Sequence, residues 1–176
     1  MNLLAFFFEL LPIAGFFISY QLYGIFFAAV IGVGLSIIVI GTSWYREKHF
    51  APFPFFSLLI SVTLTVMALW LSDAIFIKMQ PTFFNGIFGA LLLGGLLIDK
   101  PLMQVFFGKQ FLLSDRTWHQ LSSRWGWFLL ALAIANEIVW RNNSEEFWVS
   151  YKTFVAAPSV LVFMMLQLPL TLKGRL

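Results

Sequence analysis

Ionisable side chains that fall inside apolar stretches are the residues of this chain best suited to chemistry. Glu137 follows Asn136 within the apolar run 125–140, and Arg141 comes four residues after Glu137. At that spacing the carboxylate and the guanidinium share one face of a helix, so an ion pair is the simpler interpretation. Because an ionisable group inside a membrane is costly, Asn136 and Glu137 could instead serve a proton or substrate pathway. Glu9 would lie about two turns deep if the first apolar segment spans a membrane, and at the interface if it does not.

Signatures of known catalytic and metal sites are missing from the sequence. It contains no Gly-rich phosphate loop, no HExxH, no Gly-x-Ser-x-Gly, no paired-histidine metal site and no cysteine. The two histidines, His49 and His119, are expected in loops near the interface. We therefore predict a protein that is not an enzyme and that binds no cofactor or metal ion. A net charge of +3 without a polybasic run gives no support for nucleic-acid binding.

The composition predicts that the whole chain resides in a lipid bilayer. Hydrophobic residues make up 60% of the 176 residues and charged residues only 11%, whereas soluble domains carry about 25% charged residues. No hydrophilic stretch is long enough to fold separately, so one membrane domain covering 1–176 is expected. Long charge-free runs are typical of spanning helices and not of the alternating strands of a barrel. The predicted fold class is all-α, a polytopic transmembrane helical bundle.

Five or six spans are expected from the apolar segments. A span needs roughly 20 apolar residues. Segments of that length without any charged residue are 22–45, 53–72, 79–98 and 153–172. A fifth span, 123–140, carries Glu137, and the first segment, 3–20, is interrupted by Glu9 and Pro12 and either spans or only dips into the bilayer. The N-terminus is cytoplasmic with six spans and external with five.

Basic residues near the span ends are concentrated on one side of the predicted bundle. The positive-inside rule places the loops 46–52 and 99–124 and the C-terminus in the cytoplasm. In the second of these loops, Ser114 can cap a helix over about 114–124 in which Trp118 and Trp125 belong to an apolar stripe. This amphipathic helix is expected to lie in the cytoplasmic headgroup layer before the chain turns into the bilayer. There it would act as an anchor that favours anionic lipid.

Small, polar and proline residues inside the spans are expected to serve helix packing. Gly residues about four apart allow helices to approach closely, and amides in lipid usually bond to a neighbouring helix. The residues concerned are Gly86, Gly89, Gly94, Gly95, Asn85 and Gln167. Pro158 and Pro169 can kink the last span. A homo-oligomer formed through such surfaces is compatible with the sequence.

Several motifs occur in the order that is characteristic of a known family. They are Lys-Pro-Leu at 100–102, the spacing of Trp118 and Trp125, Asn-Glu at 136–137, Trp-Arg-Asn at 140–142, the opening ELLPIAGFF and the closing LQLPL. In these the chain resembles the inner-membrane-spanning protein YciB family, also called intracellular septation protein A. The resemblance covers nearly the whole chain, although the middle, 45–72, matches in hydrophobicity alone.

The resemblance implies a bacterial inner-membrane protein that maintains envelope integrity and membrane homeostasis and is linked to cell division. It brings no catalytic residue. Its motif residues are candidates for structural or interaction roles: Lys100, Pro101, Trp118, Trp125, Asn136, Glu137, Trp140, Arg141, Trp148 and Lys152.

Two hypotheses from different classes follow. The first is a non-enzymatic protein of envelope biogenesis that acts through contacts with other inner-membrane envelope or division proteins. The second is a small transporter or lipid-handling protein that uses the intramembrane polar residues Glu9, Asn136 and Glu137. The second hypothesis predicts a water-filled polar path between helices.

Overall fold

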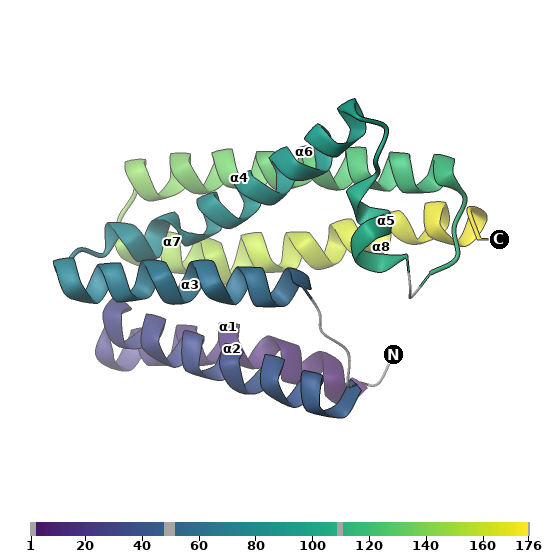
Figure 1. Ribbon diagram of the computed structural model, residues 1–176. Helices are drawn as coiled ribbons and strands as arrows, with labels where there is room; N and C mark the ends of the chain where they lie inside the picture. The colour runs from purple at the N-terminus through teal and green to yellow at the C-terminus, as the bar shows by residue number, and fades with distance from the viewer. Residues whose placement is uncertain (1–2, 48–51, 109–110, 176) are drawn as a thin grey trace. The chain divides into compact units, whose positions relative to one another are not determined.

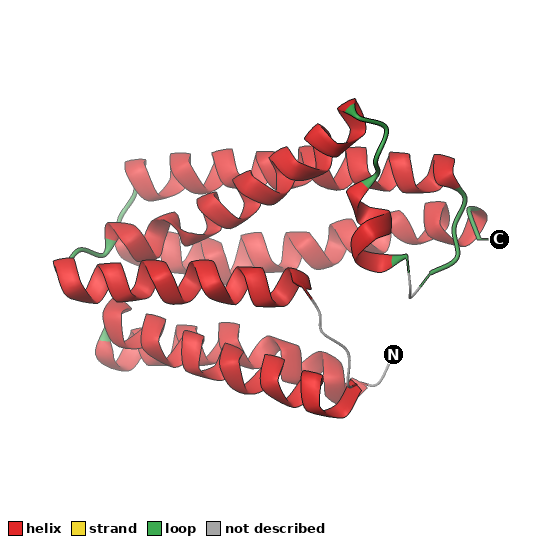
Figure 2. Ribbon diagram, viewed as in Figure 1, coloured by secondary structure: helices red, strands yellow, loops and turns green. Residues whose placement is uncertain are grey.

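The computed structural model of the protein describes residues 3–47, 52–108 and 111–175. Within these ranges the chain is almost entirely helical (Figures 1 and 2), which confirms the predicted all-α fold class. The elements in chain order are α1 (Leu3–Tyr23), α2 (Ile25–Glu47), α3 (Pro52–Leu71), α4 (Ile75–Leu97), α5 (Leu102–Phe107), α6 (Asp115–Asn142), α7 (Glu145–Tyr151), a π-helical turn (Lys152–Ala156) and α8 (Ala157–Lys173).

Four helical segments of the described residues are long and apolar enough to cross a membrane. They are Ile25–Arg46, Pro54–Leu71, Ile75–Leu97 and Glu145–Lys173. They overlap the four charge-free segments predicted from the sequence, although the first ends at Arg46, the third begins at Ile75 and so includes Lys78, and the last begins at Glu145 and not at 153. The remaining predicted spans, 3–20 and 123–140, are helical but are not among these four. The total of five or six spans therefore stays a prediction.

The chain divides into two compact units, Met1–Gln80 and Pro81–Leu176, and the boundary falls within α4. In the first unit α1 and α2 form a helical hairpin that turns at Gly24, whose φ of 83° suits a residue without a side chain. Gly32 of α2 packs on Phe16 of α1, where a Cβ would be in ordinary van der Waals contact, 3.5 Å from the Phe16 ring. Gln80 then ties the start of α4 to α3 by donating to the Thr65 hydroxyl at 2.9 Å.

The second unit is built on α6, the longest helix among the described residues. The structure corrects the predicted interfacial helix at 114–124, because Asp115–Asn142 is one uninterrupted helix. Its apolar stripe packs on protein and is not left for lipid, because Trp118 and Leu121 are buried with Leu113 against other parts of the chain. Periodicity located the stripe correctly but could not tell protein from lipid as its partner.

The last segment of the second unit is a nearly continuous helix from α7 through α8 (Figure 1). Ser144 caps its start by accepting a hydrogen bond from the Phe147 backbone N–H. This cap explains why the helix begins earlier than the charge-free run predicted. Pro158 has no N–H to donate, and just before it the helix widens so that the Ala157 N–H bonds to the Lys152 carbonyl in a π-helical turn.

Candidate functional site

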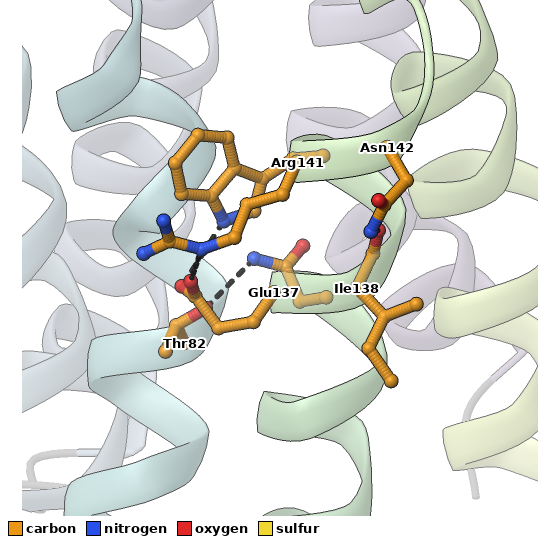
Figure 3. Close-up of polar contacts among 7 residues, drawn as sticks. Thr82, Glu137, Ile138, Arg141 and Asn142 are labelled. Carbon is orange, nitrogen blue, oxygen red and sulfur yellow. Dashed lines mark hydrogen bonds and ion pairs between the residues drawn. The ribbon is translucent and has the colours of Figure 1, made fainter.

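A chain of polar side chains links α4, α6 and α7 at one end of the second unit. It contains five residues that the sequence singled out, Asn136, Glu137, Trp140, Arg141 and Trp148, and one that it did not, Thr82. Figure 3 shows Thr82, Glu137 and Arg141 meeting where α4 faces α6. We call this set the polar link.

The Glu137 carboxylate accepts hydrogen bonds from three donors. Its Oε1 accepts from the Thr82 hydroxyl at 2.8 Å and from the Trp140 indole N–H at 3.0 Å, and its Oε2 accepts from Arg141 Nε at 2.6 Å. The Arg141 guanidinium also lies over the Trp140 ring, 4.5 Å from its centroid. The predicted ion pair of Glu137 and Arg141 is therefore confirmed. Both carboxylate oxygens of Glu137 therefore accept hydrogen bonds, from donors on α6 itself and on α4.

Asn136 joins the carboxylate end of the polar link to α7. Its side-chain N–H donates to the Thr82 hydroxyl at 2.9 Å, and its side-chain carbonyl accepts from the Trp148 indole N–H at 3.0 Å. Asn136 is 2% exposed and Trp148 is completely buried. Hydrogen bonds of this kind between helices in a membrane contribute about 0.6 to 2 kcal/mol each. The polar link therefore holds three helices in register.

Thr82 connects the two halves of the polar link and was missed by sequence reasoning. Its hydroxyl accepts from Asn136 and donates to Glu137, so every hydrogen bond from Trp148 to Glu137 points the same way. No signal in the sequence could have singled it out, because a threonine inside an apolar span is common and its partners lie more than 50 residues away.

Three further candidate residues of the second unit, Lys152, Trp118 and Trp125, lie beside the polar link or toward the opposite end of α6. Lys152 lies beside the link, with its Nζ 5.2 Å from the Trp148 ring centroid. Trp118 is in the buried cluster near the start of α6, and Trp125 packs edge-to-face on Phe163 of α8. At a rise of about 1.5 Å per residue, Trp118 and Asn136 are roughly 27 Å apart along α6.

Lys100 and Pro101 belong to neither of these two sets of contacts. Pro101 is buried and Lys100 is exposed; both follow the turn after α4, in which Asp99 has a φ of 55°. Glu9 lies in α1, in the first unit, and its side chain lies outside the described part of the structure. Gln167 behaves as predicted for an amide in a span, because it accepts a hydrogen bond from Arg124 of α6 at 3.2 Å.

The start of α6 carries a second polar contact, between His119 and Asp99. His119 Nε2 lies 2.8 Å from Asp99 Oδ1, and His119 Nδ1 lies 2.8 Å from the Asp115 carbonyl oxygen. Because both ring nitrogens face acceptors, the doubly protonated ring satisfies both contacts. The Asp115 carbonyl and, next, the Asp99 carboxylate raise the pKa of His119 above its ordinary value. This contact fastens the end of α4 to α6 outside the predicted span 123–140.

A pH-dependent loss of stability should follow from the His119 contact. Because the pKa is raised in the folded state, the contribution to the free energy of unfolding is complete below about pH 6.5 and is lost as the pH rises through the folded pKa. The pair is largely exposed, so we expect a loss of at most about 1 kcal/mol. Detergent-solubilised protein unfolded at a series of pH values measures it. An identical pH dependence in His119→Gln would contradict this assignment.

With four segments long and apolar enough to cross a membrane, these contacts define a class of protein: a polytopic α-helical membrane protein whose apolar helices are joined by polar side chains. The chain belongs to the intracellular septation protein A family, whose profile matches residues 4–175.

Relatives in several bacteria share much of the sequence. The inner membrane-spanning protein YciB of Brucella anthropi is 40% identical over 152 residues, which cover 86% of this chain and 69% of that protein. The proteins of the same name from Brucella melitensis biotype 1 and Brucella suis biovar 1 are also 40% identical, and the match covers 76% of each. No solved structure matches the chain. The family supports the inner membrane as the location, and its name refers to septation and not to an enzymatic reaction.

Proposed function

We propose that the protein is a non-enzymatic inner-membrane protein that supports septation and envelope biogenesis through contacts with other inner-membrane proteins. The family supports the cellular role. The proposed mode of action, through contacts between proteins, is supported by the hydrogen bonds of Glu137. Its carboxylate accepts from a threonine, a tryptophan and an arginine. A carboxylate held this way is suited to fixing helices and has little freedom to exchange protons.

The orientation of the protein belongs to this proposal as well. Lys173 and Arg175 at the C-terminus lie at the same end of the second unit as Arg116, since Arg175 pairs with Leu113 just before α6. By the positive-inside rule this end faces the cytoplasm. The polar link then lies toward the external face of the membrane.

The transport hypothesis makes a different use of the same residues. It needs Glu137 to release and take up a proton or to contact a substrate, together with Asn136 and Glu9. The three donors on Glu137 oppose this use, because each must be displaced before the carboxylate can serve another partner. The geometry therefore favours the first hypothesis.

Complementation by Glu137→Gln separates the two hypotheses. A strain lacking the gene should show impaired envelope integrity and division, measured by detergent sensitivity and cell length, and the wild-type gene should restore both. The glutamine side chain retains an oxygen that can accept the hydrogen bond from Thr82, but it has no titratable group. We therefore expect the Glu137→Gln variant to restore envelope integrity and division when it is present at the wild-type protein level. A variant present at wild-type levels that fails to complement would instead support transport. A deletion without any envelope or division defect would overturn the proposed role.

A further inference from the structure

The C-terminus is fastened to the segment that precedes α6. The Ser114 N–H donates to the Gly174 carbonyl at 2.9 Å, and Leu113 and Arg175 form an isolated antiparallel bridge. The Gly174 N–H donates in turn to the Leu170 carbonyl, which ends α8. We call residues 113–114 and 174–175, with Thr117, the C-terminal clamp.

Gly174 is required for the close contact within the clamp. A Cβ at this position would lie 2.6 Å from Thr117 Cγ2 and closer still to the Thr117 hydroxyl oxygen. Thr117 cannot easily move away, because its side chain is buried and its hydroxyl shares a 2.8 Å hydrogen bond with the Ser114 hydroxyl. The position of the C-terminal residues is therefore fixed by packing, and the basic residues beside Gly174 are held in place.

The clamp gathers basic side chains at this end of the second unit. Lys173 and Arg175 flank Gly174, and Arg116 lies in the first turn of α6, beside the Ser114 that the C-terminus contacts; all three are exposed. Lys100, also exposed, follows Asp99, which His119 attaches to α6. The acidic residues nearby are Asp115 and Asp99, and Asp99 is already paired with His119. The surface therefore carries an excess of positive charge.

Large apolar side chains are exposed on the neighbouring segment. Val105 of α5 is 71% exposed, Leu112 is 74% exposed and Phe111 is 41% exposed. A basic surface that bound only a soluble anion would gain nothing from them. A membrane surface uses both, because apolar side chains enter the boundary of the acyl chains while Lys and Arg meet the headgroups.

We propose that Lys100, Arg116, Lys173 and Arg175, positioned by the C-terminal clamp and flanked by Val105, Phe111 and Leu112, form a binding surface for the headgroups of anionic phospholipids. The surface differs from the predicted amphipathic helix, whose apolar stripe is buried in the protein. It is also independent of the proposed role in septation, since it requires only that this end of the unit lies at a charged membrane surface.

Lipid binding to the full-length protein in detergent micelles tests the charge requirement. Native mass spectrometry would compare phosphatidylglycerol with phosphatidylethanolamine of the same acyl chains. We expect the anionic lipid to bind at least about tenfold more tightly, and each basic residue replaced by glutamine to weaken its binding about fivefold. Arg175→Gln is compared with Arg46→Gln, which removes an exposed charge from the end of α2. Equal binding of the two lipids, or equal effects of the two substitutions, would overturn the proposal.

Gly174→Ala tests the arrangement, since it leaves every charge in place and disturbs only the clamp. The backbone at Gly174 has a φ of −91°, which alanine adopts readily, so the only obstacle is contact with Thr117. We expect a loss of phosphatidylglycerol binding similar to that of Arg175→Gln, in protein that keeps its helical circular dichroism. If Gly174→Ala bound phosphatidylglycerol as tightly as the wild type, net charge alone would explain the binding. The proposal that the C-terminal clamp positions the basic residues would then be refuted. Displacement of the lipid by excess inorganic phosphate would show a phosphate site in place of a membrane contact.

Discussion

Gly89→Ala is expected to lower the free energy of unfolding by about 2 kcal/mol, because α4 and α6 touch at this position without room for a methyl group. A Cβ on Gly89 would lie 2.9 Å from the Gly126 carbonyl oxygen and 2.9 Å from Leu130 Cγ. The leucine side chain can turn away, but the carbonyl belongs to the α6 backbone and can move only with its helix. Titration with SDS in mixed micelles, followed by circular dichroism, measures the loss.

Gly94→Ala is the matched control on the same helix. Nothing lies within 4 Å of a Cβ at Gly94, so alanine there should be neutral or should raise stability by up to about 1 kcal/mol through its better helix propensity. The same one-carbon change therefore has opposite expected signs at two positions of α4. Equal effects at Gly89 and Gly94 would show that the close contact of α4 with α6 does not contribute to stability.

These two glycines also show what sequence reasoning can and cannot reach. Spacing marked Gly86, Gly89, Gly94 and Gly95 together as residues that permit close approach. In the structure Gly89 meets α6, Gly95 lies against the Lys100 carbonyl and Leu102, and Gly94 meets nothing. The period of a helix tells which residues share a face, but the neighbour of that face depends on contacts between segments far apart in the chain.

The polar link divides in the same way between local and distant contacts. The ion pair of Glu137 and Arg141 could be predicted because a spacing of four residues is set by the helix itself. The bonds of Asn136 to Trp148 and to Thr82 join residues 12 and 54 positions apart. Asn136 was recognisable as a polar residue in an apolar run, yet its partners could be identified only once α4, α6 and α7 were placed.

The stripe at the start of α6 is an instructive error. Trp118 and Leu121 do share one face of a helix, as their spacing predicted, and that face is apolar. The prediction assigned the face to lipid because the residues around it are basic and polar. In fact Leu113, Met103, Phe107 and Leu170 cover it. An amphipathic pattern shows that a face must be covered by apolar atoms, and lipid and protein satisfy this requirement equally.

Asn136→Leu should destabilise the second unit by about 2 kcal/mol, although leucine has the same branched arrangement of side-chain heavy atoms and suits an apolar span. The substitution takes away the acceptor of the buried Trp148 indole N–H and a donor to the Thr82 hydroxyl. Asn142→Leu is the control, because Asn142 is exposed and its side chain donates only to the Ile138 carbonyl of its own helix (Figure 3). Unfolding in mixed micelles should show little change for the control, and equal losses for both would contradict the structural role of the polar link.

A double-mutant cycle with Trp148→Phe identifies the origin of that loss. Phenylalanine removes the indole N–H together with part of the ring, so by itself it loses both a hydrogen bond and packing in a completely buried position. If Asn136→Leu destabilises mainly by depriving that N–H of its acceptor, the double variant should be more stable than the sum of the single losses implies, by about 1 kcal/mol. Strictly additive losses would mean that Asn136 and Trp148 act separately. A positive coupling would establish that the Trp148 to Asn136 bond is what ties α7 to α6.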